Sequence, residues 1–266
     1  MSVVKNRYSQ IIERIFSKYY GEGIDVFEFT RKDIEQAAAE LSIDRPKNLG
    51  DVVYSFRYRA NLPQSIRAKA REGNEWIIRP AGPGKYQFVL VKEARFRPNE
   101  NMLKIKIPDA TPGIVAKYSV ADEQALLAKI RYNRLVDIFT GITCYSLQNH
   151  LRTTLPNMGQ VETDEVYVGL DKQGAHYIFP IQAKGGTDQI GAVQIEQDFL
   201  ICREKYPDAI GRPLAAQFLD NQTIVLFEFA LSDEGLKIAS EKHYRLVQPD
   251  ELTTEEIKEY QKRVSS

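Results

Sequence analysis

Apolar residues recur at helical spacing near the start of the chain. Across residues 5–20, isoleucine and aromatic side chains fall three or four positions apart, as they do on one face of a helix. Thr30 and Asp33 have the spacing of a capping box and open a second expected helix, which runs through Leu41. A third expected helix spans residues 47–59.

Two short runs rich in apolar and aromatic residues follow, at 75–79 and 85–91. The sequence Ala-Gly-Pro-Gly at 81–84 separates them and is a strong turn signal, so the two runs predict a β-hairpin. Three helices followed by a hairpin describe a winged helix-turn-helix domain, which we expect over residues 1–97.

The pattern changes in the middle of the chain. Residues 161–170 are rich in β-branched and aromatic side chains, and residues 176–181 form a short apolar run; Asp-Lys-Gln-Gly at 171–174 supplies a turn between them. The strands of a hairpin lie side by side, so Asp164 can converge with Gln182 and Lys184 at one end of the sheet. Alternation along the second strand puts Gln182 and Lys184 on the same face.

Helical and extended patterns flank this hairpin. Residues 122–152 carry apolar side chains in roughly helical order, and residues 190–206 predict a second helix that stops before Pro207. Its polar residues Gln194, Glu196 and Gln197 are expected on an exposed face. Runs at 214–219 and 223–230 predict strands that extend the sheet. This alternation predicts a three-layer α/β core over residues 114–266.

Proline and glycine bracket residues 98–113, which we expect to be a linker between the two domains. The short apolar run Met-Leu-Lys-Ile-Lys-Ile within it is a candidate edge strand of either domain. The charged tail at 250–266 predicts a final helix that packs on the core.

The spacing of Asp164, Gln182 and Lys184 resembles that of the PD-(D/E)xK nuclease superfamily, in which an Asp begins one strand and an acidic residue-x-Lys lies on the next. Here the second acidic position is Gln182. The resulting Gln-x-Lys resembles the variant of Mrr-type nucleases and some restriction endonucleases. The resemblance covers residues 122–229 at the level of the fold and implies a restriction-endonuclease-like α/β/α core. An ordinary β-hairpin with solvated charges is the alternative.

The resemblance implies that Asp164 and Gln182 are ligands of Mg²⁺, for which Mn²⁺ can substitute, and that Lys184 is the catalytic amine. Mg²⁺ prefers oxygen ligands, but an amide oxygen carries no formal charge, so weak resting affinity is expected. Glu165 is an alternative to Asp164, because a one-residue register shift exchanges the face of every side chain, and Glu162, which has the same parity as Asp164, is a candidate outer ligand. Lys184 would help to orient or activate water and stabilise charge developing on phosphorus.

Basic residues concentrate in the N-terminal part, although the formal net charge of the chain is zero. Between residues 43 and 97, twelve Lys and Arg residues stand against five acidic residues. This excess is the electrostatic footprint expected for phosphate contact. The expected DNA contacts lie near the end of the third helix and on the hairpin: Arg57, Tyr58, Arg59, Arg79 and Lys85. Winged-helix folds also dock proteins, so protein docking is the alternative.

Length, cysteine content and hydropathy limit the remaining possibilities. The 266 residues exceed the usual range of one domain. Cys144 and Cys202 form no CxxC pattern, so neither a disulfide framework nor a structural zinc is indicated. His150, near the end of the long expected helix, and His176, on the hairpin, are expected to be satisfied or exposed. The chain has no signal-like start and no membrane-length apolar run, so we expect a cytoplasmic protein without a membrane partner.

The resemblance, together with the expected winged-helix domain, implies a Mg²⁺-dependent DNA endonuclease that acts on double-stranded DNA, with a type II restriction endonuclease as the nearest functional class. Cleavage of both strands requires two active sites, so a homodimer is expected. A repair or anti-phage nuclease of looser specificity is one alternative. A catalytically inactive DNA-binding regulator is another.

Overall fold

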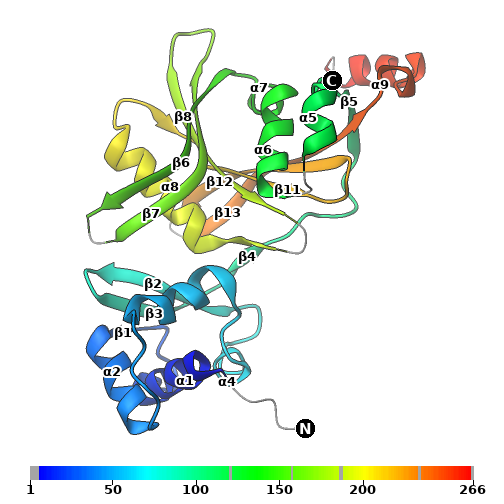
Figure 1. Cartoon of the computed structure of the whole chain (residues 1–266). Coiled ribbons are helices and arrows are strands. Elements are labelled where there is room, and N and C mark those ends of the chain that lie inside the picture. The colour runs from blue at the N-terminus through cyan, green and yellow to red at the C-terminus, as the bar shows by residue number, and fades with distance from the viewer. Residues whose placement is uncertain (1–5, 120–121, 157, 186–187, 233–234, 265–266) are drawn as a thin grey trace.

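The computed structural model of the chain describes residues 6–119, 122–156, 158–185, 188–232 and 235–264, apart from the side chains of Arg59 and Val264. The fold is mixed α/β, as the sequence predicts. Within the described residues, a three-stranded sheet forms the core of an N-terminal unit and an eight-stranded sheet forms the core of a larger C-terminal unit. The two units lie one above the other in Figure 1, with the crossing of the chain at β4 (Arg95–Phe96).

The N-terminal unit contains the three expected helical segments and the hairpin, and it adds a strand after the first helix. Its sheet order is β1-β3-β2, and both pairings are antiparallel. The predicted capping box is confirmed, because Asp33 Oδ2 accepts hydrogen bonds from the backbone N–H and the hydroxyl of Thr30, each at 2.8 Å. The elements in chain order are α1 (Arg7–Tyr19), β1 (Val26–Thr30), α2 (Arg31–Glu40), α3 (Leu49–Tyr54), a π-helical turn (Ser55–Arg59), α4 (Gln64–Arg67), β2 (Glu75–Gly82) and β3 (Lys85–Val91).

Aromatic side chains fill the space between α1 and this sheet. Phe16 of α1 lies edge-on to Trp76 and to Phe88, with ring centroids 5.2 and 5.1 Å apart. Phe29 of β1 stacks at a tilt on Phe88 and on Tyr86. Edge-on and tilted aromatic pairs stabilise a core beyond the burial of their area. The hairpin is therefore held firmly against the helices.

The C-terminal unit is built on one mixed sheet with the order β5-β13-β12-β11-β8-β7-β6, and β10 pairs beside β8. Two of its pairings, β11 with β8 and β5 with β13, are parallel, as is that of β10 with β8. The strands predicted at 161–170, 176–181, 214–219 and 223–230 are confirmed. The strands are β5 (Lys104–Pro108), β6 (Thr143–Leu155), β7 (Gly159–Leu170), β8 (His176–Lys184), β10 (Ile210–Gly211), β11 (Leu214–Phe218), β12 (Thr223–Ser232) and β13 (Gly235–Val247).

Helices cover both faces of the central part of this sheet (Figure 1). On one face, α6 (Glu123–Tyr132) and α7 (Leu135–Thr140) bury their apolar side chains against Ile181 and Leu226. On the other face, α8 (Ala192–Lys205) buries Ile195 against Phe227. The sheet therefore lies between two helical layers, as its predominantly buried β8, β11 and β12 require.

One long helix expected over residues 122–152 is wrong. Helix α6 ends at Tyr132, α7 ends at Thr140, and residues 143–155 form β6. Arg134 and Gly141 flank α7 with positive φ of 50° and 70°, a backbone conformation that breaks a helix. His150 therefore lies on a strand. The edge position of β6 leaves most of its residues exposed, which hides the alternation that identifies buried strands.

Two strand pairings connect the units. Strand β4, which begins only a few residues after the β2–β3 hairpin ends, pairs with β9 (Ile190–Gly191). Phe96 of β4 is fully buried against Phe229 in the C-terminal core. Strand β5, within the expected linker, forms an edge of the C-terminal sheet. The final helix α9 (Thr254–Val264) packs beside β5, where the Tyr260 hydroxyl accepts from the backbone N–H of Lys106. In the described residues, no helix has the length and apolar character needed to cross a membrane.

Candidate active site

The alternation of β7 changes phase at Asp164. Val161, before it, packs in the cluster beneath α8, and so does Val166, after it, although the two are an odd number of residues apart. On β6, His150 has a φ of 48° and lies between the neighbours that pair with Thr163 and Glu165, and the register of the β6–β7 pairing shifts nearby, between Ser146 and Gln148. Such a local change of backbone re-aims side chains beside a functional site. Asp164 lies at the point where the side chains of β7 change the face of the sheet to which they point.

Asp164 lies in a cavity and makes one directed contact with the next strand. The backbone N–H of Ala183 donates to Asp164 Oδ2 at 2.8 Å. Burial raises the pKa of the Asp164 carboxyl, while this hydrogen bond and the nearby Lys184 ammonium oppose the shift. The carboxylate is thus held between the strands with its charge only partly compensated.

Gln182 is oriented by a carboxylate behind it. Its amide Nε2 donates to Asp198 Oδ2 at 3.0 Å and to Oδ1 at 3.2 Å, and Asp198 on α8 is fully buried. Burial raises the pKa of Asp198 well above its ordinary range, and the Gln182 amide opposes that shift. Because the amide nitrogen is held at Asp198, the amide oxygen points the other way, where Gln194 Nε2 donates to it at 3.3 Å.

Lys184 meets a glutamate that the sequence pattern did not single out. Lys184 Nζ lies 3.4 Å from Glu123 Oε1, at the first residue of α6. Burial raises the pKa of Glu123, Lys184 lowers it, and the charges of Asp164 and Asp188 raise it further. Glu123 lies far from the hairpin in the sequence. Only the packing of α6 on β8 brings it to this position.

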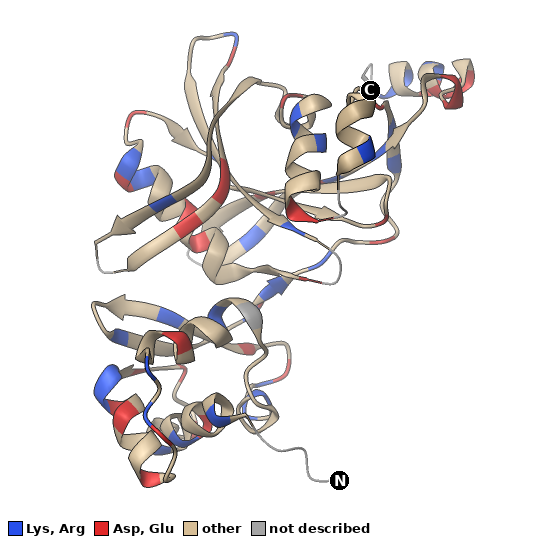
Figure 2. Cartoon of the chain, viewed as in Figure 1, with Lys and Arg blue, Asp and Glu red and all other residues tan. Residues whose placement is uncertain are grey.

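These side chains line one cavity of about 590 Å³ between the two units. Figure 2 marks acidic positions along β7, on the side of the sheet that faces the N-terminal unit. The N-terminal unit contributes Tyr54, Arg57 and Tyr58 to the walls. The C-terminal unit contributes Glu123, His150, Arg152, Gln160, Val161, Glu162, Asp164, Gln182, Lys184, Asp188, Gln194 and Gln197. The three residues predicted for catalysis are therefore brought together in one place.

The two alternative carboxylates differ in position. Glu162 lines the cavity and is paired with Arg152 Nε at 2.9 Å. Glu165 points to the opposite face, where it is fully buried and accepts from Arg131 of α6 at 2.9 Å and from the Ser146 hydroxyl. Glu165 is therefore absent from the lining of this cavity, because Oε1 of its carboxylate pairs with Arg131 on the other side of the sheet.

Most potential metal ligands of the cavity are oxygen atoms, and His150 adds ring nitrogens to its lining. In the part of the chain that the structure describes, no group of three or more His, Cys, Asp or Glu side chains is arranged to hold a metal ion. Asp164 and Glu123 nevertheless place two partly compensated carboxylates beside the amide oxygen of Gln182. Oxygen ligands of this kind fit a hard cation such as Mg²⁺, held weakly.

The residues expected to touch DNA occupy different surroundings. Arg57 and Tyr58 face the boundary between the units, where Gln197 Nε2 donates to the Tyr58 hydroxyl. Arg79 forms a bidentate ion pair with Glu196 of α8, with Nε 2.8 Å from Oε2. The guanidinium expected to contact DNA is thus held in a contact between the two units. The side chain of Arg59 lies outside the described residues.

Lys85 lies on a separate groove of about 940 Å³ between the hairpin and the turn that joins β6 to β7. Arg31 and Lys32 at the start of α2 line the same groove. Tyr54, Arg57 and Gln160 line both this groove and the cavity of Asp164. A basic path therefore leads from the hairpin to the candidate active site.

The polar residues of α8 are not on an exposed face, contrary to expectation. Gln197 is buried, Gln194 contacts Gln182, and Glu196 pairs with Arg79. The first turns of α8 lie between the sheet and the N-terminal unit, so these polar residues are covered, whereas the last turn, from Arg203 on, is exposed. The lack of a continuous polar stripe on α8, with buried Gln197 and Asp198 among apolar neighbours, is the signal that could have indicated this.

Comparison with known proteins adds no assignment. No family model, no curated protein and no solved structure matches the chain.

Proposed function

We propose that the protein is a metal-dependent DNA endonuclease of the PD-(D/E)xK type, in the variant that carries Gln at the second ligand position. The observation that supports this most directly is the convergence of Asp164, Gln182 and Lys184 in one cavity. Asp164 and Gln182 share a cavity wall with a lysine that has a carboxylate partner, which an ordinary hairpin with solvated charges would not require. Glu123, from a separate helix, adds a second carboxylate.

In this proposal Asp164, Gln182 and Glu123 would hold Mg²⁺. The ion supplies Lewis acidity and lowers the pKa of a bound water. Lys184 carries a positive charge 3.4 Å from the Glu123 carboxylate, close enough for that carboxylate to hold the ammonium in position. From there Lys184 orients the attacking water and stabilises negative charge on the scissile phosphate. Asp198 keeps the Gln182 oxygen directed away from the buried side.

The N-terminal unit would be a winged-helix DNA reader. Its order of helix, strand, two helices, π-helical turn, short helix and hairpin, together with the β1-β3-β2 sheet, supports that interpretation. Lys85, Arg31 and Lys32 give the groove beside the hairpin a positive charge suited to a phosphate backbone. A reading module joined directly to a nuclease suits a type II restriction endonuclease, acting as a homodimer on double-stranded DNA. A repair or anti-phage nuclease of looser specificity is the nearest alternative function.

A catalytically inactive DNA-binding regulator is the second candidate. It is favoured by one observation: the Gln182 amide already has hydrogen-bond partners on both ends, Asp198 and Gln194. A satisfied amide has less tendency to bind a cation than an exposed carboxylate. In this case the protein keeps the nuclease fold, but the cavity catalyses no reaction.

Incubation with DNA separates these candidates. Purified protein is mixed with methylated and unmethylated plasmid and phage DNA in Mg²⁺, Mn²⁺ or EDTA, and the products are separated on a gel. Discrete fragments that need the metal support a sequence-specific endonuclease. A smear supports a nuclease of looser specificity. DNA that is shifted but intact under every condition contradicts the endonuclease and supports the regulator.

A further inference from the structure

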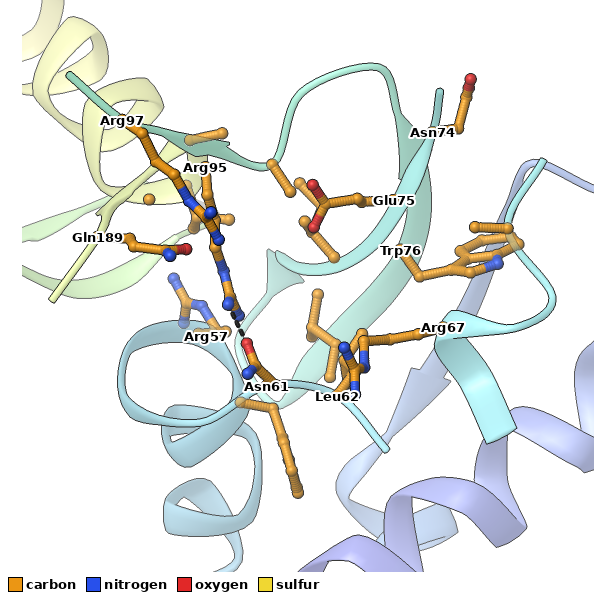
Figure 3. Close-up of a pocket in the computed structure, with 18 residues that line it drawn as sticks. Arg57, Asn61, Leu62, Arg67, Asn74, Glu75, Trp76, Arg95, Arg97 and Gln189 are labelled. Atoms are coloured by element: carbon orange, nitrogen blue, oxygen red, sulfur yellow. Dashed lines mark hydrogen bonds between the residues drawn. The ribbon is translucent and has the colours of Figure 1, made fainter. Parts of the chain in front are cut away.

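A second cavity, of about 450 Å³, lies beside the active-site cavity and is lined by four arginines (Figure 3). Arg57 comes from the π-helical turn and Arg67 from α4, whereas Arg95 and Arg97 belong to the crossing segment. Figure 3 shows the side chains of Arg57, Arg95 and Arg97 close together on one side of the cavity, with Asn61 and Gln189 beside them. We refer to this cavity as the arginine pocket.

The arginines of this pocket contact neutral groups. Arg95 donates to the amide oxygen of Asn61. Arg97 donates from Nε and Nη2 to the Gln189 amide oxygen, at 2.9 and 2.7 Å, in the amide orientation that satisfies both side chains. Arg57 has buried Nε and Nη2 atoms that find no hydrogen-bond partner among the described residues. Buried guanidinium nitrogens are expensive to leave unpaired, so a missing acceptor is indicated.

Positive charge in the pocket is poorly compensated. Burial lowers the pKa of Arg57, and it also lowers the pKa of Arg95, to which Arg67 and Arg97 add like-charge repulsion. Glu75 is the one carboxylate that the structure describes along the lining, and its attraction for Arg95 only partly opposes these effects. A bound anion would supply both the missing acceptors and the missing charge. Arginine forks match phosphate geometry particularly well.

The arginine pocket and the candidate active-site cavity share lining residues with one smaller hollow. A smaller hollow of about 210 Å³ shares Arg57, Arg95 and Gln189 with the arginine pocket. The same hollow shares Lys184, Asp188 and Gln194 with the cavity of Asp164. A chain of phosphates could therefore extend from one cavity into the other. The volume of the arginine pocket also suits a single nucleotide.

We propose that the arginine pocket binds the phosphate group of a nucleotide, through Arg57, Arg95 and Arg97. The site goes beyond the proposed endonuclease and does not depend on cleavage. Its phosphate would come either from a free nucleotide or from a DNA strand that continues from the active-site cavity. The chemistry of recognition is the same in both cases, and the experiment distinguishes the sources.

Trp76 provides a local reporter. It is the only tryptophan of the chain and lines the arginine pocket. Tryptophan emission and isothermal titration calorimetry are recorded in EDTA, where no metal-dependent cleavage occurs. The probes are inorganic phosphate, a deoxynucleoside monophosphate and a short DNA duplex. We expect saturable binding, which Arg95→Gln and Arg97→Gln each weaken at least about tenfold. Arg203→Gln, on an exposed part of α8, is the matched control and should bind as the wild type.

The outcomes divide as follows. Binding of the monophosphate that the duplex does not displace supports a free nucleotide as the source, and displacement by the duplex supports a strand phosphate. Binding of the duplex alone, weakened by Arg95→Gln or Arg97→Gln but unaffected by Arg203→Gln, supports a strand phosphate. Absence of binding by all three probes overturns the proposal, and so does unchanged affinity in whichever arginine variant keeps the wild-type melting temperature. If the wild-type protein binds phosphate in this pocket but does not cleave DNA with Mg²⁺ or Mn²⁺, only the proposed endonuclease activity is contradicted.

Discussion

Gln182 Nε2 lies 3.0 Å from Asp198 Oδ2, so the amide that lines the candidate active-site cavity is hydrogen-bonded to a fully buried carboxylate of α8. An acidic side chain at position 182 would face that carboxylate directly. The pair therefore explains, in physical terms, why an amide is tolerated and favoured at this position. Two carboxylates in such a place cannot both ionise without a cation.

Gln182→Glu should destabilise the protein by about 3 kcal/mol at pH 8, because it buries a second carboxylate against Asp198. The crowded carboxyls have raised pKa values in the folded state, so stability is present below the unfolded value and is lost as the pH rises through the folded value. The loss should be smaller at pH 5. Urea unfolding at both pH values measures it. Adding Asp198→Asn should restore most of the stability, and a double variant no more stable than Gln182→Glu alone would contradict this.

Lys184→Ala should reduce DNA cleavage at least about a hundredfold and leave DNA affinity largely unchanged, because the ammonium acts on the charge of the transition state. Initial cleavage rates and gel-shift titrations are compared. Lys172→Ala, in the exposed turn of the same hairpin, is the matched control and should cleave normally. Unchanged cleavage in Lys184→Ala would remove this lysine from the mechanism.

Glu123→Gln should lower cleavage about 10- to 100-fold and increase the Mg²⁺ concentration needed for half-maximal rate. The substitution keeps the shape of the side chain and removes a charge that faces Lys184. A metal titration of the cleavage rate provides the measurement. Glu204→Gln, exposed near the end of α8, serves as the control. An unaltered metal dependence would exclude Glu123 from the ligand set.

Arg79 and Glu196 should show a favourable coupling of about 1 kcal/mol in a double-mutant cycle, because their two-pronged pair is half-buried between the units. Thermal or urea unfolding of Arg79→Ala, Glu196→Ala and the double variant gives this value. Additive effects would show that the pair contributes nothing.

Salt dependence of DNA binding separates Arg79 from Lys85. Lys85→Ala should reduce the slope of log affinity against log salt by about one, because its ammonium lies on the open groove. Arg79→Ala should leave the slope nearly unchanged, since Glu196 already occupies its guanidinium. A larger change for Arg79→Ala than for Lys85→Ala would reverse this assignment.

Asp33 should make the N-terminal unit sensitive to acid. Burial alone would raise its pKa, but hydrogen bonds from Tyr19, Thr30 and Lys18 outweigh burial and bring the pKa to about 2. A lowered folded pKa contributes stability above the unfolded value of 3.8, and this contribution is lost as the pH falls toward 2. Asp33→Asn should cost about 1 kcal/mol at pH 7 and less near pH 2, a discounted value because of solvent screening. Trp76 emission during urea unfolding measures it, with exposed Glu22→Gln as the control.

Local pattern was enough to predict helix α1 and the β7–β8 hairpin. The buried residues of α1 recur at helical spacing, and the hairpin was predicted from β-branched, aromatic and apolar runs on either side of a turn signal. Strand β6 was not, since an exposed edge strand has little need of apolar alternation. The phase change at Asp164 could not be predicted either, because it depends on the backbone of His150 on the neighbouring strand.

The candidate site was predictable only where it is local in sequence. Asp164, Gln182 and Lys184 lie on one hairpin, so their convergence follows from strand pairing. Glu123 reaches Lys184 through the packing of α6, and Asp198 reaches Gln182 through the packing of α8. Those two contacts are decided by the tertiary arrangement, which no local spacing encodes.

The pairing of β4 with β9 limits how far the N-terminal unit can move. Only residues 92–94 separate β3 from β4, and Phe96 anchors β4 in the opposite core. A connection this short holds the two units at a fixed separation. If the N-terminal unit reads DNA and the C-terminal unit cuts it, the number of base pairs between the recognised sequence and the cleaved bond would be constant. The protein would set that number, whatever the sequence of the DNA between them.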